Sequence, residues 1–402
     1  MLKYETESKI LLDLIWAAVH PDADQAMDAV PGCDMKKLTA MIVQQSLVAM
    51  IYPVIARQTD DCWKTVKEKL DPIYEREAHK GMVQEYEIQT LLDDMEQDGI
   101  DCLPMKGWVM RNYYPEPLMR SMGDLDVLVK DLDSAKMQSW MEARGYQAVH
   151  SEEGFHDEYQ KSPYMYVELH HTLMDKRWLR PSEALWVDEI TPAFWKDSAR
   201  AEGKKHVFQL SDELFYVHHI SHFYKHFTES GVGIRPLIDL YFFLKAKGNS
   251  INRAYINQQL EQLHLLNFSK QMEKISLACF KEKPRVDHQT MLVVDYLTHS
   301  GIYGNRLTRE TLRATHEKQS GKDRAQQFWG RCFLPLGEMK KIYPYLQKYP
   351  MLLPVCWLGR IFRIVFLQNY KFGLMKSAQS EDTQENIKAV YRAAGIENNQ
   401  LR

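Results

Sequence analysis

The sequence predicts an α+β fold in which a small core with a sheet lies between two helical regions. Three changes of pattern along the chain support this. Apolar residues follow helical spacing in residues 1–98, short apolar runs bounded by Gly, Pro and Asp occupy residues 99–205, and helical spacing returns in residues 206–402. We place an N-terminal helical region, an α+β core and a C-terminal helical domain in these three ranges.

The end of the N-terminal region carries a clear helical signal. Ile88, Leu91, Leu92 and Met95 recur at the i, i+3, i+4, i+7 spacing of one helix face, and Gly99 is placed to end that helix. Charged residues interrupt the apolar residues at the start of the chain, so we expect no export signal there.

The middle region alternates between strand and helix signals. Short apolar runs predict strands at residues 101–105, 125–129 and 164–169. Residues 108–114 can form a short helix. A second helix is expected between Asp133, a suitable N-cap, and Gly145, a suitable C-terminal stop.

The C-terminal domain is expected to be mostly helical, with one apolar stretch that needs interpretation. Residues 351–367 are apolar but contain Pro354, Arg360 and Arg363, which makes a membrane span a poor fit. We interpret the stretch as a buried or groove-lining helix and expect no membrane contact. The alternative is an interfacial helix whose arginines face lipid headgroups.

Charge and cysteine content exclude several classes of function. Lys and Arg total 51 against 54 for Asp and Glu, and no long basic block is present. General coating of nucleic acid is therefore not expected. The six cysteines form no CxxC pair, which favours reduced thiols and a cytoplasmic location over a disulfide framework or a zinc knuckle.

The most informative motif is an Asp-X-Asp pair at the start of an apolar run. Gly123 precedes Asp124 and Asp126, and a strand with period two would place both carboxylates on one face, roughly 6–7 Å apart. Two carboxylates at this spacing can hold Mg²⁺ whose other ligands are water and phosphate oxygens. The alternative is a solvated turn.

A third acid stands in the predicted strand at residues 164–169. Tyr166, Glu168 and His170 would share one face of this strand, opposite Val167 and Leu169. Burial of an ionised carboxylate is unfavourable without a cation or strong donors, so a metal shared with the Asp pair would explain Glu168. The alternative is an edge strand with Glu168 in water.

Three residues upstream are candidates to bind phosphate. Gly107 lets the backbone approach a ligand where a strand turns into a helix, and Lys106 adds a positive charge there. Arg120 could hold a phosphate with two hydrogen bonds. The alternative is that Lys106 and Arg120 are ordinary surface residues.

These motifs together resemble the polymerase-β-like nucleotidyltransferase superfamily, in particular its branch of uncharacterised bacterial nucleotidyltransferases. The resemblance extends from about residue 100 to 245. It is carried by Met105-Lys106-Gly107, Arg120, Asp124-Leu125-Asp126, Glu168-Leu169-His170, the helix at residues 218–226, and the segment at residues 235–239.

The resemblance implies a small mixed sheet and transfer of a nucleoside monophosphate from a nucleoside triphosphate such as ATP to a hydroxyl group, with release of pyrophosphate. It implies Asp124, Asp126 and Glu168 as catalytic residues and as ligands of Mg²⁺ or Mn²⁺. Gly123 and the Lys106-Gly107 turn would contact the nucleotide, Lys106 replacing by position the Gly-Ser of other members. The acceptor is left open among a small molecule, a protein and an RNA.

A helix rich in histidine follows the predicted core. His218, His219, His222 and His226 fall on one arc of this helix. A zinc hydrolase is disfavoured, because no HExxH glutamate and no nearby cysteine are present. We prefer a helix that faces the site, with Lys225 or His226 toward nucleotide phosphates. Packing at a domain interface is the alternative.

Two other functions remain to be separated from this one. A regulatory protein could retain nucleotide binding on a catalytically degenerate core. An Asp-X-Asp glycosyltransferase would use the carboxylate pair to hold a metal on a nucleotide-sugar diphosphate, although that fold usually needs a longer sheet.

Overall fold

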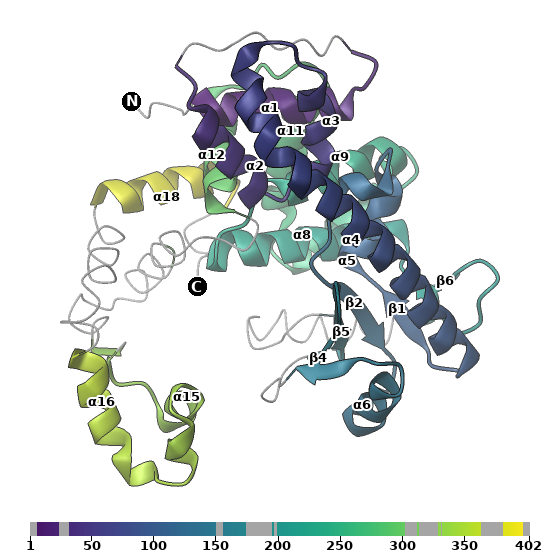
Figure 1. Ribbon diagram of the computed structural model, residues 1–402, viewed down its shortest axis with the longest axis vertical. Helices are drawn as coiled ribbons and strands as arrows, with labels where there is room; N and C mark the ends of the chain where they lie inside the picture. Colours follow the sequence, from purple (N-terminus) through teal and green to yellow (C-terminus); the bar gives the residue numbers. More distant parts are fainter. Residues whose placement is uncertain are drawn as a thin grey trace.

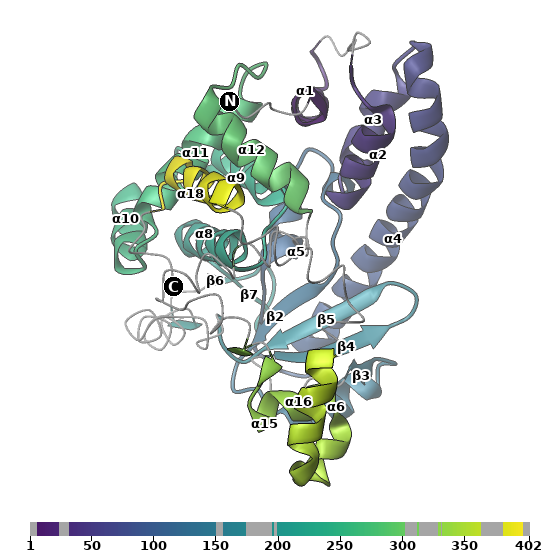
Figure 2. The same cartoon turned by 90° about the vertical axis from the view of Figure 1, so that its left-hand side faces the viewer.

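The computed structural model describes residues 6–23, 32–149, 156–173, 195–196, 199–301, 312, 329–330, 332–362 and 381–396. A small sheet lies against a larger helical body, and one long helix extends from that body past the sheet (Figure 1). The same arrangement is visible from the side (Figure 2). The predicted α+β class is confirmed.

Four α-helices precede the sheet. Asp34 caps α2 by accepting hydrogen bonds from the amides of Lys36 and Lys37. The fourth helix has 34 residues and ends just before Gly99, whose φ of 72° suits glycine, as the sequence predicts. The bounds are α1 (Thr6–Val19), α2 (Met35–Gln44), α3 (Val48–Ala56), the short 3₁₀ turn η1 (Asp61–Trp63) and α4 (Lys64–Gln97).

The main sheet has five strands in the order β1-β2-β5-β4-β3. The β2 and β5 strands are parallel, and every other neighbouring pair is antiparallel, so the sheet is mixed. The three predicted strands are present, but β3 and β4 were not foreseen. The bounds are β1 (Cys102–Pro104), β2 (Leu125–Val129), β3 (Gln147–Val149), β4 (His156–Lys161) and β5 (Met165–His170).

Short helices and a second small sheet complete the core. Asp133 caps α6 by accepting from the amide of Lys136, and Gly145 follows that helix at a φ of 82°, as predicted. The bounds are α5 (Lys106–Met110), η2 (Arg111–Tyr113), η3 (Pro117–Met119), α6 (Ser134–Glu142), β6 (Ala199–Arg200) and β7 (Phe208–Gln209).

The two faces of the main sheet have different neighbours. Val127 and Val167 point to one face, where they form an apolar cluster with the C-terminal part of α4 and with α6. Leu128 points to the other face and packs into the large helical core. Because side chains alternate along a strand, Asp126 and Glu168 lie on the face that is directed toward the helical body.

The helices after the sheet share a single core with the N-terminal helices. Ile15 and Ile51 from the first part of the chain and Phe223, Phe243 and other large residues from the last part belong to one buried cluster. The bounds are α8 (Asp212–Glu229), α9 (Arg235–Lys247), α10 (Arg253–Gln262), α11 (Leu266–Phe280), α12 (His288–Ser300) and α18 (Glu381–Ala393).

A separate small cluster lies near the C-terminus, where α15 (Leu336–Ile342) and α16 (Leu353–Phe362) stand apart from the main helical body (Figure 1). Of the buried or groove-lining helix expected at residues 351–367, the buried form is wrong for the described part. Met351 is 81% exposed and Leu358 is 67% exposed. Only Cys356 of α16 is buried, because only one narrow face of α16 packs on α15 and on the segment that joins the two helices. Residues 363–367 lie outside the described residues.

None of the described helices is long and apolar enough to cross a bilayer.

A buried ion pair ties the core to the helical body. The Arg120 guanidinium donates two hydrogen bonds to the Asp239 carboxylate on α9, with N–O distances of 2.8 and 3.0 Å. The Tyr114 hydroxyl donates a third to the same carboxylate at 2.6 Å. All three residues are largely shielded from water, so loss of one partner would leave a buried charge without compensation.

We predict that Asp239→Ala lowers the free energy of unfolding by about 3–5 kcal/mol, since it leaves the Arg120 charge buried and unpaired. Tyr114→Phe should cost about 1.5–3 kcal/mol, the value of one hydrogen bond to a charged group. Urea denaturation measures both. Lys136→Ala breaks an exposed pair with Asp133 and serves as the control, with no measurable change expected. A loss for Asp239→Ala no larger than for Lys136→Ala would contradict the assignment.

Candidate active site

Three adjacent strands bring the acidic residues together on one face of the sheet. In the parallel register of β2 and β5, Asp126 lies beside Glu168. In the antiparallel register of β5 and β4, Glu168 lies beside Glu158. Asp124 immediately precedes β2 and, by the alternation along a strand, is on the same face as Asp126. The predicted cluster of three carboxylates is therefore assembled, and Glu158 extends it by one strand.

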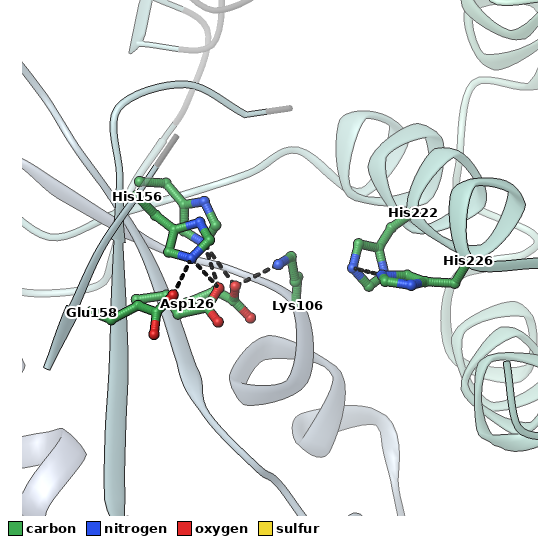
Figure 3. Close-up of polar contacts among 8 residues, drawn as sticks. Lys106, Asp126, His156, Glu158, His222 and His226 are labelled. Atoms are coloured by element: carbon green, nitrogen blue, oxygen red, sulfur yellow. Dashed lines mark hydrogen bonds and ion pairs between the residues drawn. The ribbon is translucent and has the colours of Figure 1, made fainter. Parts of the chain in front are cut away.

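Asp126 is the best-shielded carboxylate of the cluster, with 5% of its side chain exposed. It forms an ion pair with the Lys106 ammonium, and its Oδ1 atom is 2.7 Å from His170 Nε2 (Figure 3). Burial acts to raise the pKa of Asp126, but Lys106 and His170 outweigh it and hold that pKa well below its usual range. Asp126 is thus ionised at neutral pH.

The pKa of Asp124 shifts in the opposite direction to that of Asp126. Burial, together with the negative charges of Asp126 and Glu168, raises the pKa of Asp124 to about 6. Lys106 lowers that pKa by a smaller amount. The cluster therefore holds more negative charge than its protein neighbours neutralise, which is the electrostatic condition for binding a cation.

Glu168 lies on the central strand of the sheet, so the alternative of an edge strand is wrong. Its side chain is 24% exposed, and its Oε2 atom is 3.4 Å from His170 Nε2 and 3.9 Å from His156 Nε2. The carboxylate thus keeps access to solvent while two imidazole rings approach it from the same side.

Lys106 occupies a strained backbone position. It begins α5 with a φ of 46°, in the left-handed region that non-glycine residues rarely adopt. Burial acts to lower the pKa of Lys106, but the carboxylates of Asp126, Glu168 and Asp124 raise it overall, so the ammonium stays charged. Strain of this kind persists where surrounding contacts determine the conformation, and here the ion pair with Asp126 is such a contact.

Gly107, Gly123 and Arg120, which were also predicted to contact nucleotide, lie in three different segments of the core. Gly107 follows Lys106 in α5, and a Cβ atom there would be 3.5 Å from Met122, an ordinary contact. Gly123 lies in the bend that leads into β2. Arg120 is bound to Asp239, so its guanidinium is used within the protein.

The sequence allows the histidines of α8 either to face the site or to pack between helices, and different histidines do each. His219 contacts the carbonyl oxygen of Pro236 at 3.0 Å and so packs between helices. His222 and His226 lie across from Lys106, with their Nε2 atoms 3.0 Å apart (Figure 3). Burial, then the charges of Lys225 and Lys106, lower the pKa of His226 to about 4. Burial, followed by His226 and Lys106, holds the pKa of His222 well below its usual value, so both rings are neutral at pH 7.

Sequence reasoning missed His156 and Glu158 because β4 was not recognised as a strand. Its sequence, His-Asp-Glu-Tyr-Gln-Lys, has one buried apolar residue, Tyr159, and so lacks an apolar alternation. The available signal was the Ser162-Pro163 turn before β5, which indicates a hairpin. His170 was placed on the correct face but was given no role of its own.

The mixed sheet, with an Asp-X-Asp strand beside a strand that carries a third acid, agrees with the small mixed sheet that the nucleotidyltransferase resemblance implies. The family model of the uncharacterised nucleotidyltransferases matches residues 31–280, and the chain belongs to this family. The match includes α2 to α4 before the sheet and α8 to α11 after it. A search of curated proteins and a search of solved structures each found no match.

The raised pKa of Asp124 predicts how stability changes with pH in protein treated with EDTA. This carboxyl has a folded pKa of about 6 against an ordinary value of 3.8, so the unfolded chain loses the proton first as pH rises. The contribution of Asp124 to stability is complete below pH 4 and is lost through pH 6, by an amount of the order of 3 kcal/mol. Asp124→Asn should therefore gain stability relative to wild type as pH rises from 4 to 7.

Urea denaturation at pH 4 and pH 7 measures this difference. Asp131→Asn, which changes an exposed carboxyl just beyond the same strand, is the matched control and should follow the wild type at both pH values. If Asp124→Asn and wild type change in parallel, the carboxylate cluster does not carry uncompensated charge.

Proposed function

We propose that this nucleotidyltransferase moves a nucleoside monophosphate from a nucleoside triphosphate to a hydroxyl group of an acceptor and releases pyrophosphate, with Mg²⁺ or Mn²⁺ held by Asp124, Asp126 and Glu168. The observation that carries the proposal is the placement of these three carboxylates on one face of neighbouring strands. The family match supports the reaction class.

The donor set fits a hard divalent cation. Mg²⁺ binds oxygen ligands, takes few of them from protein and completes its shell with water and phosphate oxygens. Carboxylate oxygens from β2 and β5 are available, and the raised pKa of Asp124 indicates negative charge that the protein does not neutralise. When bound, the ion supplies Lewis-acid stabilisation of the negative charge on the phosphates.

The reaction exchanges one phosphorus–oxygen bond for another. The acceptor oxygen forms a bond to the α-phosphorus, the bond from that phosphorus to the bridging oxygen breaks, and pyrophosphate leaves with the electron pair. In this proposal Glu168, whose side chain is 24% exposed and lies close to His156 and His170, accepts the proton of the acceptor hydroxyl.

Lys106 contributes a positive charge beside the carboxylates. Its ammonium pairs with Asp126. With a divalent ion held by the carboxylates, the ammonium would be available to bind the phosphates of the nucleotide. His222 and His226, on the opposite side of Lys106, are neutral and can donate hydrogen bonds without repelling this charge (Figure 3).

Arg120 acts as a positioning residue in this proposal. Its ion pair with Asp239 holds the segment between η3 and β2 against α9, and its Nη1 atom donates to the carbonyl oxygen of Ser121 at 2.8 Å. Arg235 of α9 donates to the same carbonyl at 3.0 Å. The segment that leads into Asp124 is therefore fixed from two sides.

Incubation of the full-length protein with each α-labelled nucleoside triphosphate, Mg²⁺ and a cell lysate tests the reaction. We expect label on one class of acceptor, and Asp126→Asn and Glu168→Gln should each lower transfer by a factor of about 10² or more. Binding of triphosphate without transfer to any acceptor would favour a regulatory protein. Transfer from a UDP-sugar in place of a nucleotide would favour the glycosyltransferase.

Lys106→Ala should weaken binding of a triphosphate about 10- to 100-fold and leave binding of the matching nucleoside unchanged, because the lost charge faces phosphates alone. Calorimetry with Mg²⁺ present measures both ligands. The control is Lys130→Ala, which removes a lysine that follows β2 and pairs with Asp101. It should change neither triphosphate binding nor nucleoside binding. Equal weakening of triphosphate and nucleoside binding by Lys106→Ala would count against phosphate contact.

A further inference from the structure

Two imidazole rings and one carboxylate meet beside the predicted magnesium ligands. The β4–β5 register places His156 directly opposite His170, and Glu168 stands two residues before His170 on the same face. The Nε2 atoms of both rings approach Glu168 Oε2, at 3.9 Å from His156 and 3.4 Å from His170. One ligand atom from each of the three residues lies within 4.8 Å of the others.

The orientation of the rings favours convergence of their nitrogens over packing of their faces. The ring centroids of His156 and His170 are 5.2 Å apart and their planes are tilted by 49°. The rings are therefore not stacked. Both Nε2 atoms are directed toward carboxylate oxygens: that of His156 lies 3.0 Å from Glu158 Oε1 (Figure 3), and that of His170 lies 2.7 Å from Asp126 Oδ1.

The separations suit one metal ion. A divalent ion bound at about 2.1 Å to each of two ligand atoms holds those atoms about 3.0–4.2 Å apart, for angles between 90° and 180°. The two measured distances to Glu168 fall in this range. His156 and Glu168 are each 24% exposed, so small rotations can complete the site and solvent can deliver the ion, while His170 is buried and fixed.

We propose that His156, Glu168 and His170 form a binding site for a divalent transition-metal ion such as Zn²⁺, adjacent to the Asp124–Asp126 pair. Two imidazoles and one carboxylate are the protein ligands of many zinc and iron sites, which leave the remaining positions open for water or substrate. The histidines of α8, for which the sequence disfavours a zinc hydrolase, are a different set.

Imidazole ligation distinguishes this site from the proposed magnesium site. Mg²⁺ strongly prefers oxygen, whereas Zn²⁺, Co²⁺ and other later transition ions bind imidazole nitrogen well. The neighbouring carboxylates Asp126 and Glu158 lie 2.7 and 3.0 Å from the two Nε2 atoms and add favourable negative charge. With an ion bound, each ring would carry its proton on Nδ1 and coordinate through the lone pair of Nε2 as a neutral ligand, and any proton displaced from Nε2 would leave to solvent.

The inference rests on the proposed function in one respect, because Glu168 serves both sites. A transition ion held by the histidines would stay bound between turnovers, and the magnesium ion would arrive with the nucleotide. Glu168, between the two, would then couple the transition-metal site to the reaction.

Metal binding is measured on the full-length protein after removal of metals with EDTA and without nucleotide. Calorimetry with Zn²⁺ should give one tight site per chain, with a dissociation constant at least 100-fold below that for Mg²⁺. Protein loaded with one equivalent of Cu²⁺, which binds imidazole strongly, should show coupling of the electron spin to ¹⁴N in pulsed electron paramagnetic resonance, which reports imidazole bound directly to the ion.

The variants separate this site from other histidines. His156→Ala should weaken Zn²⁺ binding at least tenfold and reduce the ¹⁴N coupling. It is the primary variant, because its side chain is partly exposed and replacement of buried His170 risks unfolding. Melting curves in EDTA verify that it is folded. His171→Ala, which removes a ring paired with Asp157 next to the site, should bind Zn²⁺ as wild type does. His226→Ala tests the histidine pair of α8.

Equal Zn²⁺ affinity of wild type and His156→Ala, absence of ¹⁴N coupling, or loss of binding in His226→Ala alone would each overturn the proposal. The transfer assay with Mg²⁺ on the same preparations separates the two hypotheses. Transfer without Zn²⁺ binding would overturn only the transition-metal site, and Zn²⁺ binding at His156 without transfer would overturn only the proposed reaction.

Discussion

The arrangement of the active site depends on how one buried charge is neutralised. Asp126 lies in the interior of the sheet face with almost no exposure, and such a carboxylate is tolerated only with close partners. Lys106 and His170 supply them from two different elements. This requirement explains the strained φ of Lys106 and the position of the helix that it begins. The same pairing leaves Asp124 without a comparable partner, so one site holds a firmly ionised carboxylate beside one that gains its proton near pH 6.

The sequence was sufficient for the parts of this site that follow a simple period. Alternation in the strand that contains Asp126, and in the strand that contains Glu168, predicted both the strands and the shared face of the acids. Arg120 marks the limit of such reasoning. Its partner Asp239 is 119 residues away, and no local pattern indicates whether an arginine binds a phosphate or a distant carboxylate.

The predictions for the polar strand β4 and for the exposed helix α16 failed for related reasons. A strand that presents a polar face to a binding site and has few buried residues lacks the apolar alternation by which strands are recognised. In α16, the apolar residues have the spacing of a buried helix, yet Val355, Leu358 and Phe362 are exposed. Apolar spacing predicts which residues share a face, and only tertiary structure determines whether that face is covered.

The long helix α4 has a consequence for the cooperativity of the whole molecule. With 34 residues it is about 50 Å long, and it contributes Val66 and Leu70 to the large helical core and Ile88 and Met95 to the core under the sheet. If this helix unwinds, both cores lose the apolar side chains that it packs into them. A fragment that begins after α4 would expose the apolar face of its own sheet to water, so the segment that contains the carboxylates is not an autonomous folding unit. Its stability depends on a helix that contributes no residue to the carboxylate cluster.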